Sequence, residues 1–569
     1  MGCGDRPVGL SVHAIIRRCL SITAVIALVR PPDQMDRRSL LRLVLFALAV
    51  QVLYASGLGH TPPHLHRDEV DIALQAQSIA TTGRDLDGRL LPLYFRMHNL
   101  GPNVWFHPLI IYVTAAFLWL LPFTESAVRF PTTVIATLNV VLMYFVARRL
   151  FGTERWALVA AALLATTPAH FLHGRLAFDF IYPLPFVLIW LLCLLKYLDA
   201  GRPWLLFVAT TALGVGVFSY IASVIMMPVY LALTALVLVA KQRLSVRTGA
   251  VAAAGFFWPL LLWIPWLATQ PTFVAEVLNR YGVTGGPAAV TVAPAGSTIA
   301  ELARSAASHF RFSKVAERVT LYWAFFDPAF LYLIGGFTRM TNSTRLVGVF
   351  LMPLILLVPL GLAQMVTVRR SVVSVVIFAG FCLAPLAAVL TVLEPYASDR
   401  ELAVVVFGVL IATYGVERLV ALRGRAGRAL AVGVIALLSL HFLFFQQHYF
   451  GDYHLRSAVF YEWNHRDALE AIVSREDVTA PRPVYLTTGT ATPRAGYWRL
   501  ALVKHKRLDL LAHTTYFDAA TVDLASLPAN SLVLATVDEL RVLTGPGKLH
   551  VIYSAPEPGD EPFFHVLER

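Results

Sequence analysis

Long apolar segments separated by short polar links run through most of the chain. Several of them reach the roughly 20 apolar residues that a helix needs to cross a bilayer. This pattern predicts an α-helical polytopic membrane protein with about eleven spans within residues 35–446. The spans are expected at residues 40–58, 131–148, 156–170, 177–198, 203–220, 223–240, 250–267, 344–367, 371–393, 401–419 and 429–446.

The two ends of the chain follow different patterns. From residue 447 onward, short apolar runs alternate with helical ones, which predicts a small α/β domain at 447–569. Its strands are expected at 483–488, 531–537, 550–554 and 563–567, with helices at 466–474 and 537–543. Residues 1–34 are predicted to be a disordered cytoplasmic leader, unless the true start is Met35.

The composition supports a membrane protein and removes one class of partner. Hydrophobic residues make up 57% of the chain, charged residues 14%, and the mean hydropathy is +0.65. Soluble globular proteins carry about 25% charged residues. The net charge of +12 comes mainly from basic clusters in the short links between apolar segments, as in cytoplasmic loops. No nucleic-acid partner is therefore predicted.

These basic clusters also predict the topology. Arg37, Arg38 and Arg42 place the start of the first span inside the cell. The segment 104–121 is short and rich in Trp, Phe and Tyr, which favours an interfacial or re-entrant helix that stays external over a span. The loop after the first span, the long loop 268–343 and the C-terminal domain are then expected outside.

A polar stretch after the first span is the first place to look for chemistry. It reads His64-Leu65-His66-Arg67-Asp68-Glu69, and Arg84-Asp85 follows further on. Adjacent carboxylates beside a bilayer are costly unless they face water or a substrate. Asp68 and Glu69 are therefore candidate catalytic residues, and the alternative is a solvated loop.

Further motifs, in a consistent order, resemble one superfamily. They are Asp68-Glu69, residues 78–85 and 88–93, Ala127 to Pro131, 144–152, Thr167-Pro168, His173-Gly-Arg175, 322–331 and 394–400. Over roughly residues 40–450 the chain resembles the GT-C membrane glycosyltransferases, and among them the protein-mannosyltransferase-like group that includes the lipid A aminoarabinose transferases. The resemblance implies the GT-C fold, a polyprenyl-phosphate-linked sugar as donor, and an external site. In this family the loop after the first span supplies the essential carboxylate and carries external juxtamembrane helices.

The chain also departs from the family pattern. Many relatives have a small or apolar residue before the acidic pair, where this chain has His66-Arg67, and the family often has Ser in place of Gly174. The oligosaccharyltransferase branch carries an Asp-x-Asp metal motif, whereas this chain has only Asp179 near that place. Neither a metal site nor a cofactor is therefore predicted.

Sugar transfer assigns a role to each candidate. A carboxylate within hydrogen-bond reach can deprotonate the acceptor hydroxyl, and Asp68 is predicted to be this base. Glu69 is either an orienting or acceptor-binding group or a solvent-facing neighbour. The departing phosphate requires positive charge. The predicted donor-binding and substrate-binding residues are Arg67, Arg84, Asp85, Arg175, Asp179, Arg339, Arg345 and Arg400.

Two of these assignments have structural alternatives. Arg175 and Asp179 lie four residues apart, so they could instead form an ion pair on one helix face. Arg400 stands at a span entrance and could simply snorkel toward the head groups. The loop 268–343 is expected to close over the donor phosphate and to become ordered on binding.

The predicted function is that of an integral membrane glycosyltransferase of the bacterial inner membrane. It would move a sugar from a polyprenyl-phosphate donor to a lipid, glycan or protein acceptor on the external, periplasmic face. One alternative is a transporter or lipid flippase with an external domain, which should carry ionisable residues within its spans. Another is a non-catalytic assembly protein on the same scaffold. The sequence leaves the identities of the sugar and the acceptor open.

Overall fold

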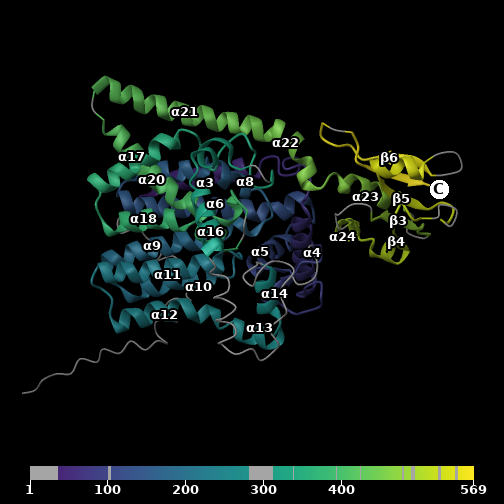
Figure 1. Ribbon diagram of the computed structural model, residues 1–569, viewed down its shortest axis with the longest axis horizontal. Coiled ribbons are helices and arrows are strands. Elements are labelled where there is room, and N and C mark those ends of the chain that lie inside the picture. Colours follow the sequence, from purple (N-terminus) through teal and green to yellow (C-terminus); the bar gives the residue numbers. More distant parts are fainter. Residues whose placement is uncertain are drawn as a thin grey trace, which may run out of the picture.

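The computed structural model describes residues 36–99, 104–280, 312–336, 339–391, 394–422, 424–476, 480–488, 494–522, 527–544, 549–559 and 561–569. The predicted leader 1–34 and residues 281–311 of the long loop lie outside these residues. Two parts lie side by side: a large helical bundle and a smaller domain that contains a β-sheet (Figure 1).

Helices make up nearly all of the bundle. They are α3 (Arg37–Ala55), α4 (Arg67–Thr82), α5 (Pro108–Leu118), α6 (Glu125–Phe151), α7 (Glu154–Ala165), α8 (Pro168–His173), η1 (Asp179–Ile181), α9 (Leu184–Ala200), α10 (Pro203–Gly216), α11 (Ser223–Ala240), α12 (Val246–Leu260), α13 (Trp263–Thr269), α14 (Phe273–Arg280), α16 (Phe312–Ala324), η2 (Phe330–Ile334), α17 (Leu354–Thr367), α18 (Val372–Leu383), α19 (Leu386–Thr391), η3 (Ser398–Arg400), α20 (Ala403–Val420) and α21 (Gly424–Phe450).

The predicted spans correspond to helices. Within the described part of the chain, 8 helical segments are long and apolar enough to cross a membrane. The other three predicted spans coincide with the shorter helices α7, α10 and α17. The apolar surface of α21 is largely uncovered by protein, with only 17% of its most apolar window buried, and this helix lies along one edge of the bundle (Figure 1). Such a surface suits contact with lipid.

The segment 104–121 does not form a long helix. A two-residue strand β2 (Trp105–Phe106) pairs with β1 (Phe95–Arg96), and the 11-residue helix α5 follows. At 1.5 Å per residue, α5 is about 16 Å long, roughly half the hydrocarbon thickness of a bilayer. It packs against α4 and α6. This supports the expectation that the segment does not cross the membrane.

Close packing of backbones holds the middle of the bundle together. Helices α17 and α20 meet at Gly361 and Gly415. A Cβ on Gly415 would collide with the carbonyl oxygen of Leu357, and one on Gly361 with that of Ile411. Small residues that let backbones approach are a common basis of helix association in membranes. Nearly all of α20 is buried as a result.

The C-terminal domain is α/β, as predicted. Its five-stranded sheet has the order β4-β3-β5-β7-β6, with β3 parallel to β4 and β5, and β7 antiparallel to β5 and β6. The elements are α22 (Asp452–Ser457), η4 (Ala458–Tyr461), α23 (His465–Val473), β3 (Val484–Thr487), α24 (Arg494–His505), η5 (Leu508–His513), β4 (Thr514–Phe517), β5 (Leu532–Thr536), η7 (Val537–Glu539), α25 (Leu540–Leu543), β6 (His550–Ser554) and β7 (Phe564–Glu568).

Most of the predicted C-terminal elements are present. Strands β3, β5, β6 and β7 and helix α23 lie where they were expected, but the sequence did not predict β4 or α24. The predicted boundary at residue 447 falls within the last turn of α21.

Candidate active site

The candidate base lies at the first turn of α4. The His66 side chain caps this helix by accepting the Asp68 N–H, and Glu69 accepts the His66 N–H. This capping box explains why the helix begins immediately after the polar stretch. The Asp68 side chain is 23% exposed, and its Oδ1 lies 3.4 Å from His66 Nδ1. The Asp68 carboxylate therefore has both a close partner and access to solvent.

Glu69 has a different environment from its neighbour. It is completely buried and accepts four hydrogen bonds, from Nε and Nη2 of Arg129 and from the backbone N–H groups of His66 and Ala177. Arg129 in turn donates to the carbonyl oxygens of Pro62 and other residues of the same loop. The solvent-facing alternative for Glu69 is therefore excluded. Its contacts make it an anchor that joins α4, α6 and the segment before η1.

Segments distant in sequence converge on Asp68. The His66 and Phe178 rings pack in a T-shaped arrangement, Phe178 contacts Phe180, and Phe180 contacts Tyr220. The Tyr220 hydroxyl donates to Asp399 Oδ2 at 3.2 Å. η1, which begins with Asp179, packs against η3, which contains Asp399. A row of aromatic rings thus connects the N-terminus of α4 to η3.

Three of the predicted donor-binding arginines belong to this cluster. Arg67 lies 3.9 Å from Asp68, and Arg400 lies 3.7 Å from Asp399. Arg339 is exposed, lies 3.4 Å from Glu394, and influences both Asp68 and Asp399 electrostatically. Asp179 has Asp68, Asp399 and Arg400 as its electrostatic neighbours. The structure therefore brings Arg67, Asp68, Asp179, Arg339 and Arg400 together.

The charges around Asp68 determine its protonation. Burial opposes ionisation, but His66, Arg67 and Arg339 outweigh it and hold the pKa of Asp68 below its ordinary value. The pKa of His66 is raised, because Asp68, Glu462 and Glu69 outweigh the effect of its burial. Asp68 is therefore an anion at neutral pH, the form that a proton acceptor requires.

Two predicted residues lie at the opposite end of α4. This helix has 16 residues and is therefore about 24 Å long. Asp85 is buried there and accepts hydrogen bonds from the backbone N–H and side chain of Arg89, while Arg84 donates to the Gly88 carbonyl. These contacts close the turn after the helix. Arg84 and Asp85 therefore lie apart from the Asp68 cluster, and their role in donor or substrate binding stays a prediction.

Arg175 is enclosed by aromatic rings. It is completely buried and lies about 5 Å from the ring centres of Phe171, Tyr449 and Phe450. It donates to the carbonyl oxygens of Tyr54 and Thr61. Helix α8 ends at His173, so the four-residue spacing to Asp179 does not lie within one helix. These contacts give Arg175 a structural role in the bundle, and its contact with a donor phosphate stays a prediction.

Arg345 also has a structural setting. Its backbone has a φ of +62°, and its guanidinium lies 4.9 Å from the centre of the Phe460 ring. Its N–H donates to the Ser343 hydroxyl.

Within the described residues, no His, Cys, Asp and Glu side chains form a group of three or more that could hold a metal ion.

Sequence reasoning missed two acidic residues near Asp68. Asp71 lies one turn further along α4, is fully buried and accepts the Asn99 N–H at 2.9 Å. Burial raises the pKa of Asp71 to about 7. Its spacing of three residues from Asp68 was the available signal. Glu462 lies 3.4 Å from Arg67 and comes from the C-terminal domain, so no local pattern could have indicated it.

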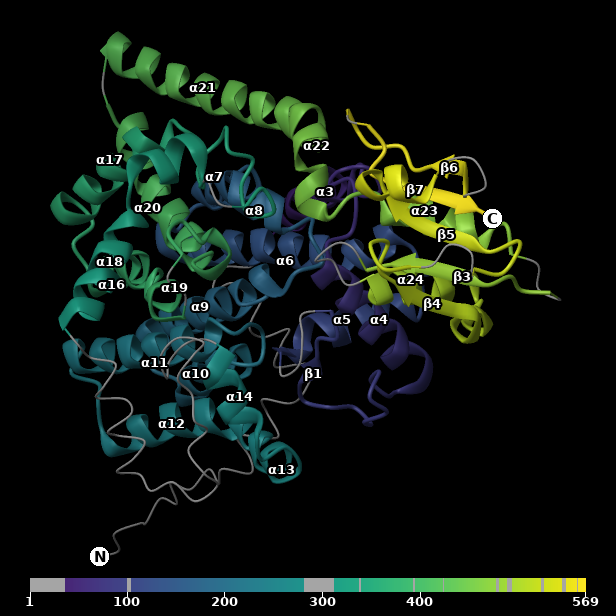
Figure 2. The ribbon, with the colours of Figure 1, turned by 45° about the vertical axis from the view of Figure 1, so that its right-hand side comes forward.

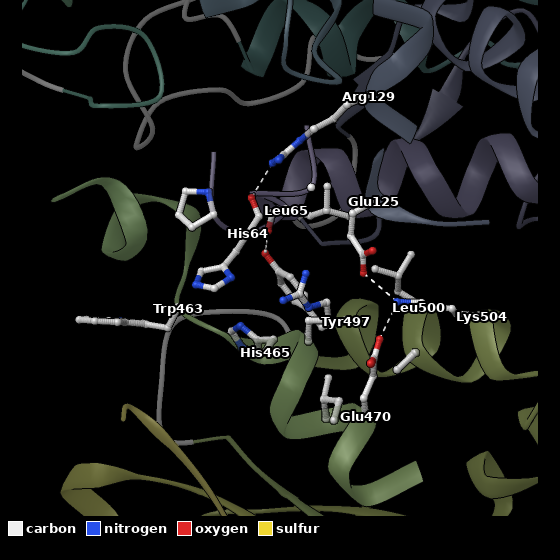
Figure 3. A pocket seen from close by; sticks show the side chains of 15 residues that line it. His64, Leu65, Glu125, Arg129, Trp463, His465, Glu470, Tyr497, Leu500 and Lys504 are labelled. Atoms are coloured by element: carbon white, nitrogen blue, oxygen red, sulfur yellow. Dashed lines mark hydrogen bonds and ion pairs between the residues drawn. The ribbon is translucent and has the colours of Figure 1, made fainter. Parts of the chain in front are cut away.

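A pocket marks the junction between the two parts of the molecule (Figure 3). Loop residues such as His64 and Leu65 form one side, and residues of α23 and α24 form the other. The Lys504 ammonium lies between two carboxylates, 3.1 Å from Glu125 and 2.6 Å from Glu470. Because these charges pair with one another, the pocket lining stabilises the docking of the C-terminal domain.

Comparisons with known proteins agree with this architecture. Residues 105–268 match the family model described as dolichyl-phosphate-mannose-protein mannosyltransferase. This match includes Arg175 and Asp179 but leaves Asp68 outside. No curated protein matches the chain.

Solved structures resemble the chain over most of its length. The crystal structure of ArnT from Cupriavidus metallidurans bound to undecaprenyl phosphate has a TM-score of 0.54 at 13% identity, covering 93% of this chain and 97% of that one. Its apo state gives 0.52 with the same identity and coverage. The archaeal oligosaccharyltransferase AglB from Archaeoglobus fulgidus gives only 0.46, at 14% identity, covering 80% of this chain and 63% of that one.

The similarity to ArnT extends over both parts of the molecule and shows a shared fold. The family model matches the middle of the same bundle independently. Together these findings show that the chain shares the fold of ArnT and that its residues 105–268 are similar to the dolichyl-phosphate-mannose-protein mannosyltransferase family.

Proposed function

We propose that this protein transfers a sugar from a polyprenyl-phosphate donor to an acceptor hydroxyl on the external face of the bacterial inner membrane, with Asp68 as the base. The observation that carries the proposal is that Arg67 and Arg339 act on the ionised carboxylate of Asp68. Arg400 lies beside Asp399, and Asp179 links it to the same cluster. The ArnT structure with a similar fold contains undecaprenyl phosphate, which supports a donor of this class. The fold also favours this reaction over a transporter or flippase.

The reaction requires two opposite charges at one place. The bond between the sugar C1 and the phosphate oxygen breaks as the acceptor oxygen bonds to C1, through an oxocarbenium-like transition state. Asp68 takes the acceptor proton. The guanidinium groups of Arg67, Arg339 and Arg400 stabilise the charge that develops on the departing phosphate. Arg339 is suited to this role because it is exposed.

Substitution of Asp68 tests the base. Mass spectrometry of envelope lipids and glycans from a deletion strain and its parent identifies the product, and variants are then tested for its restoration. Asp68→Asn keeps the size and removes the charge, so transfer should fall about 10²–10⁴-fold with normal expression. Asp87→Asn is the control, because Asp87 is also paired with an arginine but lies beyond the far end of α4. Normal transfer by Asp68→Asn would exclude Asp68 as the base.

Binding measurements test the arginines separately. Undecaprenyl phosphate is titrated against the full-length protein in detergent, with undecaprenol as the probe that lacks phosphate. Arg339→Gln and Arg400→Gln should weaken binding of the phosphate form and leave the weak binding of the alcohol unchanged. Arg37→Gln, at the start of α3, serves as the control. Equal affinities in all variants would contradict the phosphate assignment.

A further inference from the structure

The core of the C-terminal domain includes one face of the helix that carries Asp68. Leu65, Val70 and Leu74, from α4 and the residues before it, are buried in one cluster with side chains of α23, α24 and the sheet. Helices α4 and α24 lie side by side (Figure 2). The position of the N-terminus of α4 is therefore coupled to that of the C-terminal domain.

One residue of this domain reaches the two side chains that flank the predicted base. Glu462, which follows η4, lies with its Oε1 3.4 Å from Arg67 Nε and 4.0 Å from His66 Nε2. Both of these residues also contact Asp68. The Glu462 side chain is only 13% exposed. Its carboxylate thus faces the same two groups as the Asp68 carboxylate.

The orientation of Glu462 is held from two directions. The Tyr497 hydroxyl of α24 lies 3.0 Å from Glu462 Oε2 and 2.9 Å from the Leu65 carbonyl oxygen, so its single proton can be donated to either (Figure 3 shows it directed at Leu65). The backbone of Glu462 and of Trp463 is left-handed, with φ of +62° and +64°. Two consecutive non-glycine residues in this region are strained, and such strain persists where the surroundings impose it.

We propose that Glu462 is a positioning residue of the transfer site, which holds Arg67 and His66 beside Asp68 and so makes the C-terminal domain part of the active site. This inference rests on the function proposed above. With Glu462 in place, Arg67 is shared between two carboxylates, and its guanidinium stays partly exposed toward the space where a phosphate would bind. Without the Glu462 charge, Arg67 would pair with Asp68 alone and would weaken it as a proton acceptor.

The same arrangement makes the pH dependence of the reaction informative. The charged groups that face His66 are Asp68 and Glu69 from α4, Glu462 from the C-terminal domain, and the adjacent Arg67. The Tyr497 hydroxyl hydrogen-bonds to Glu462 and lies within electrostatic reach of Glu69 and Asp68. Removal of the negative charge of Glu462 lowers the pKa of both His66 and Asp68, so the acid limb of the pH–rate profile moves to lower pH.

The test uses the full-length protein in detergent, with membranes of the deletion strain as the source of donor and acceptor. Glu462→Gln should reduce transfer about tenfold or more, since small misplacements of reacting groups cost up to about 10²-fold. It should also shift the acid limb to lower pH, and Glu462→Asp should recover most of the rate. Tyr497→Phe keeps the ring packing and should give a smaller loss, which provides a second variant if Glu462→Gln folds poorly.

The control separates positioning from docking. Glu125→Gln breaks the ion pair between Lys504 and the start of α6, which joins the same two parts without touching Arg67. It should leave the pH profile unshifted. Adding Glu462→Gln to Arg67→Gln should cause a smaller further loss than Glu462→Gln causes in the wild type, because residues that act through one another are not additive.

Two results would overturn the inference. One is a Glu462→Gln variant with the wild-type rate and pH profile. The other is an equal loss in Glu462→Gln and Glu125→Gln with unshifted profiles, which would leave only domain docking. Asp68→Asn separates this failure from failure of the proposed function. If Asp68→Asn is inactive while Glu462→Gln is normal, only the positioning role is wrong. If Asp68→Asn is active, the proposed base is wrong.

Discussion

The buried pair of Glu69 and Arg129 should be one of the largest single contributions to the stability of the site. Glu69→Gln removes the negative charge and leaves the Arg129 guanidinium buried among backbone carbonyls. Breaking a buried ion pair by removing one partner costs about 3–5 kcal/mol. Gln also has one carbonyl oxygen, whereas the carboxylate accepts four hydrogen bonds with its two oxygens.

This cost can be converted into a shift in melting temperature. Unfolding of globular proteins gains about 2.1 cal/mol/K per residue, or roughly 1 kcal/mol/K for about 500 cooperatively unfolding residues. A loss of about 4 kcal/mol therefore lowers the midpoint by about 4 °C. Thermal unfolding in detergent, monitored by tryptophan fluorescence, measures the shift. Because Arg129→Gln breaks the same pair, the double variant should fall short of the sum of the single losses by roughly 0.5–3 kcal/mol.

Two outcomes would refute this reasoning. A Glu69→Gln variant with an unchanged midpoint would show that the carboxylate is not the anchor described here. Strictly additive losses in the double variant would show that Glu69 and Arg129 are not coupled. If the melting temperature were unchanged and transfer were lost, Glu69 would instead contact the acceptor, which is one of the roles predicted for it from the sequence.

Three further predictions follow from other features. Burial raises the pKa of Asp71 to about 7 in the folded protein, whereas its pKa in the unfolded chain is near 3.8. The neutral carboxyl therefore stabilises the fold fully below pH 3.8, and this stabilisation is lost as the pH rises through 7. The free energy of unfolding falls by up to about 4 kcal/mol over this range. The melting temperature of the wild type should therefore fall between pH 5 and pH 8 by several degrees more than that of Asp71→Asn, and equal slopes would contradict this. Gly415→Leu should prevent accumulation of folded protein, because α17 leaves no space for a side chain at this position. Gly433→Leu on α21 should be tolerated, because nothing lies within 4 Å of a Cβ there. Comparable yields of the two variants by size-exclusion chromatography would argue against the close contact between α17 and α20. A reporter fused after Arg569 should be active only outside the cell, and a cytoplasmic signal would reverse the proposed orientation.

Hydropathy predicted the bundle well because the bilayer imposes a minimum length on each apolar helix. It failed for elements whose burial is set by tertiary contacts. Strand β4 has the sequence Thr-Thr-Tyr-Phe, and only Phe517 of the four is buried, so it carries no alternating pattern. Helix α24 buries Tyr497 and Trp498, two neighbours, against α4 and the sheet. Neither pattern stands out without knowledge of the partner surface.

In the candidate site too, local sequence patterns indicated some residues, whereas tertiary contacts determine what each of them does. The sequence indicated Asp68 because an acidic pair beside a membrane span is unusual, but it could not separate Asp68 from Glu69. That difference depends on Arg129, which lies 60 positions further along the chain. Arg175 and Arg400 both stood near span ends, yet only the fold shows that aromatic rings enclose the first and that the second lies beside Asp399. The contribution of Glu462 required the three-dimensional packing of the C-terminal domain.

The long separation between Leu65 and Tyr497 also has a consequence for biosynthesis. Their contact joins residues 432 positions apart, whereas Glu69 and Arg129 are 60 apart. At synthesis rates of about 5–20 residues per second, Arg129 emerges roughly 3–12 s after Glu69, but Tyr497 follows Leu65 only after roughly 20–90 s. The contact of Glu69 with Arg129 can therefore form early in synthesis, whereas the contact of Leu65 with Tyr497 can form only late. A nascent chain therefore passes most of its synthesis with α4 already made but without the contacts that the C-terminal domain adds to that helix.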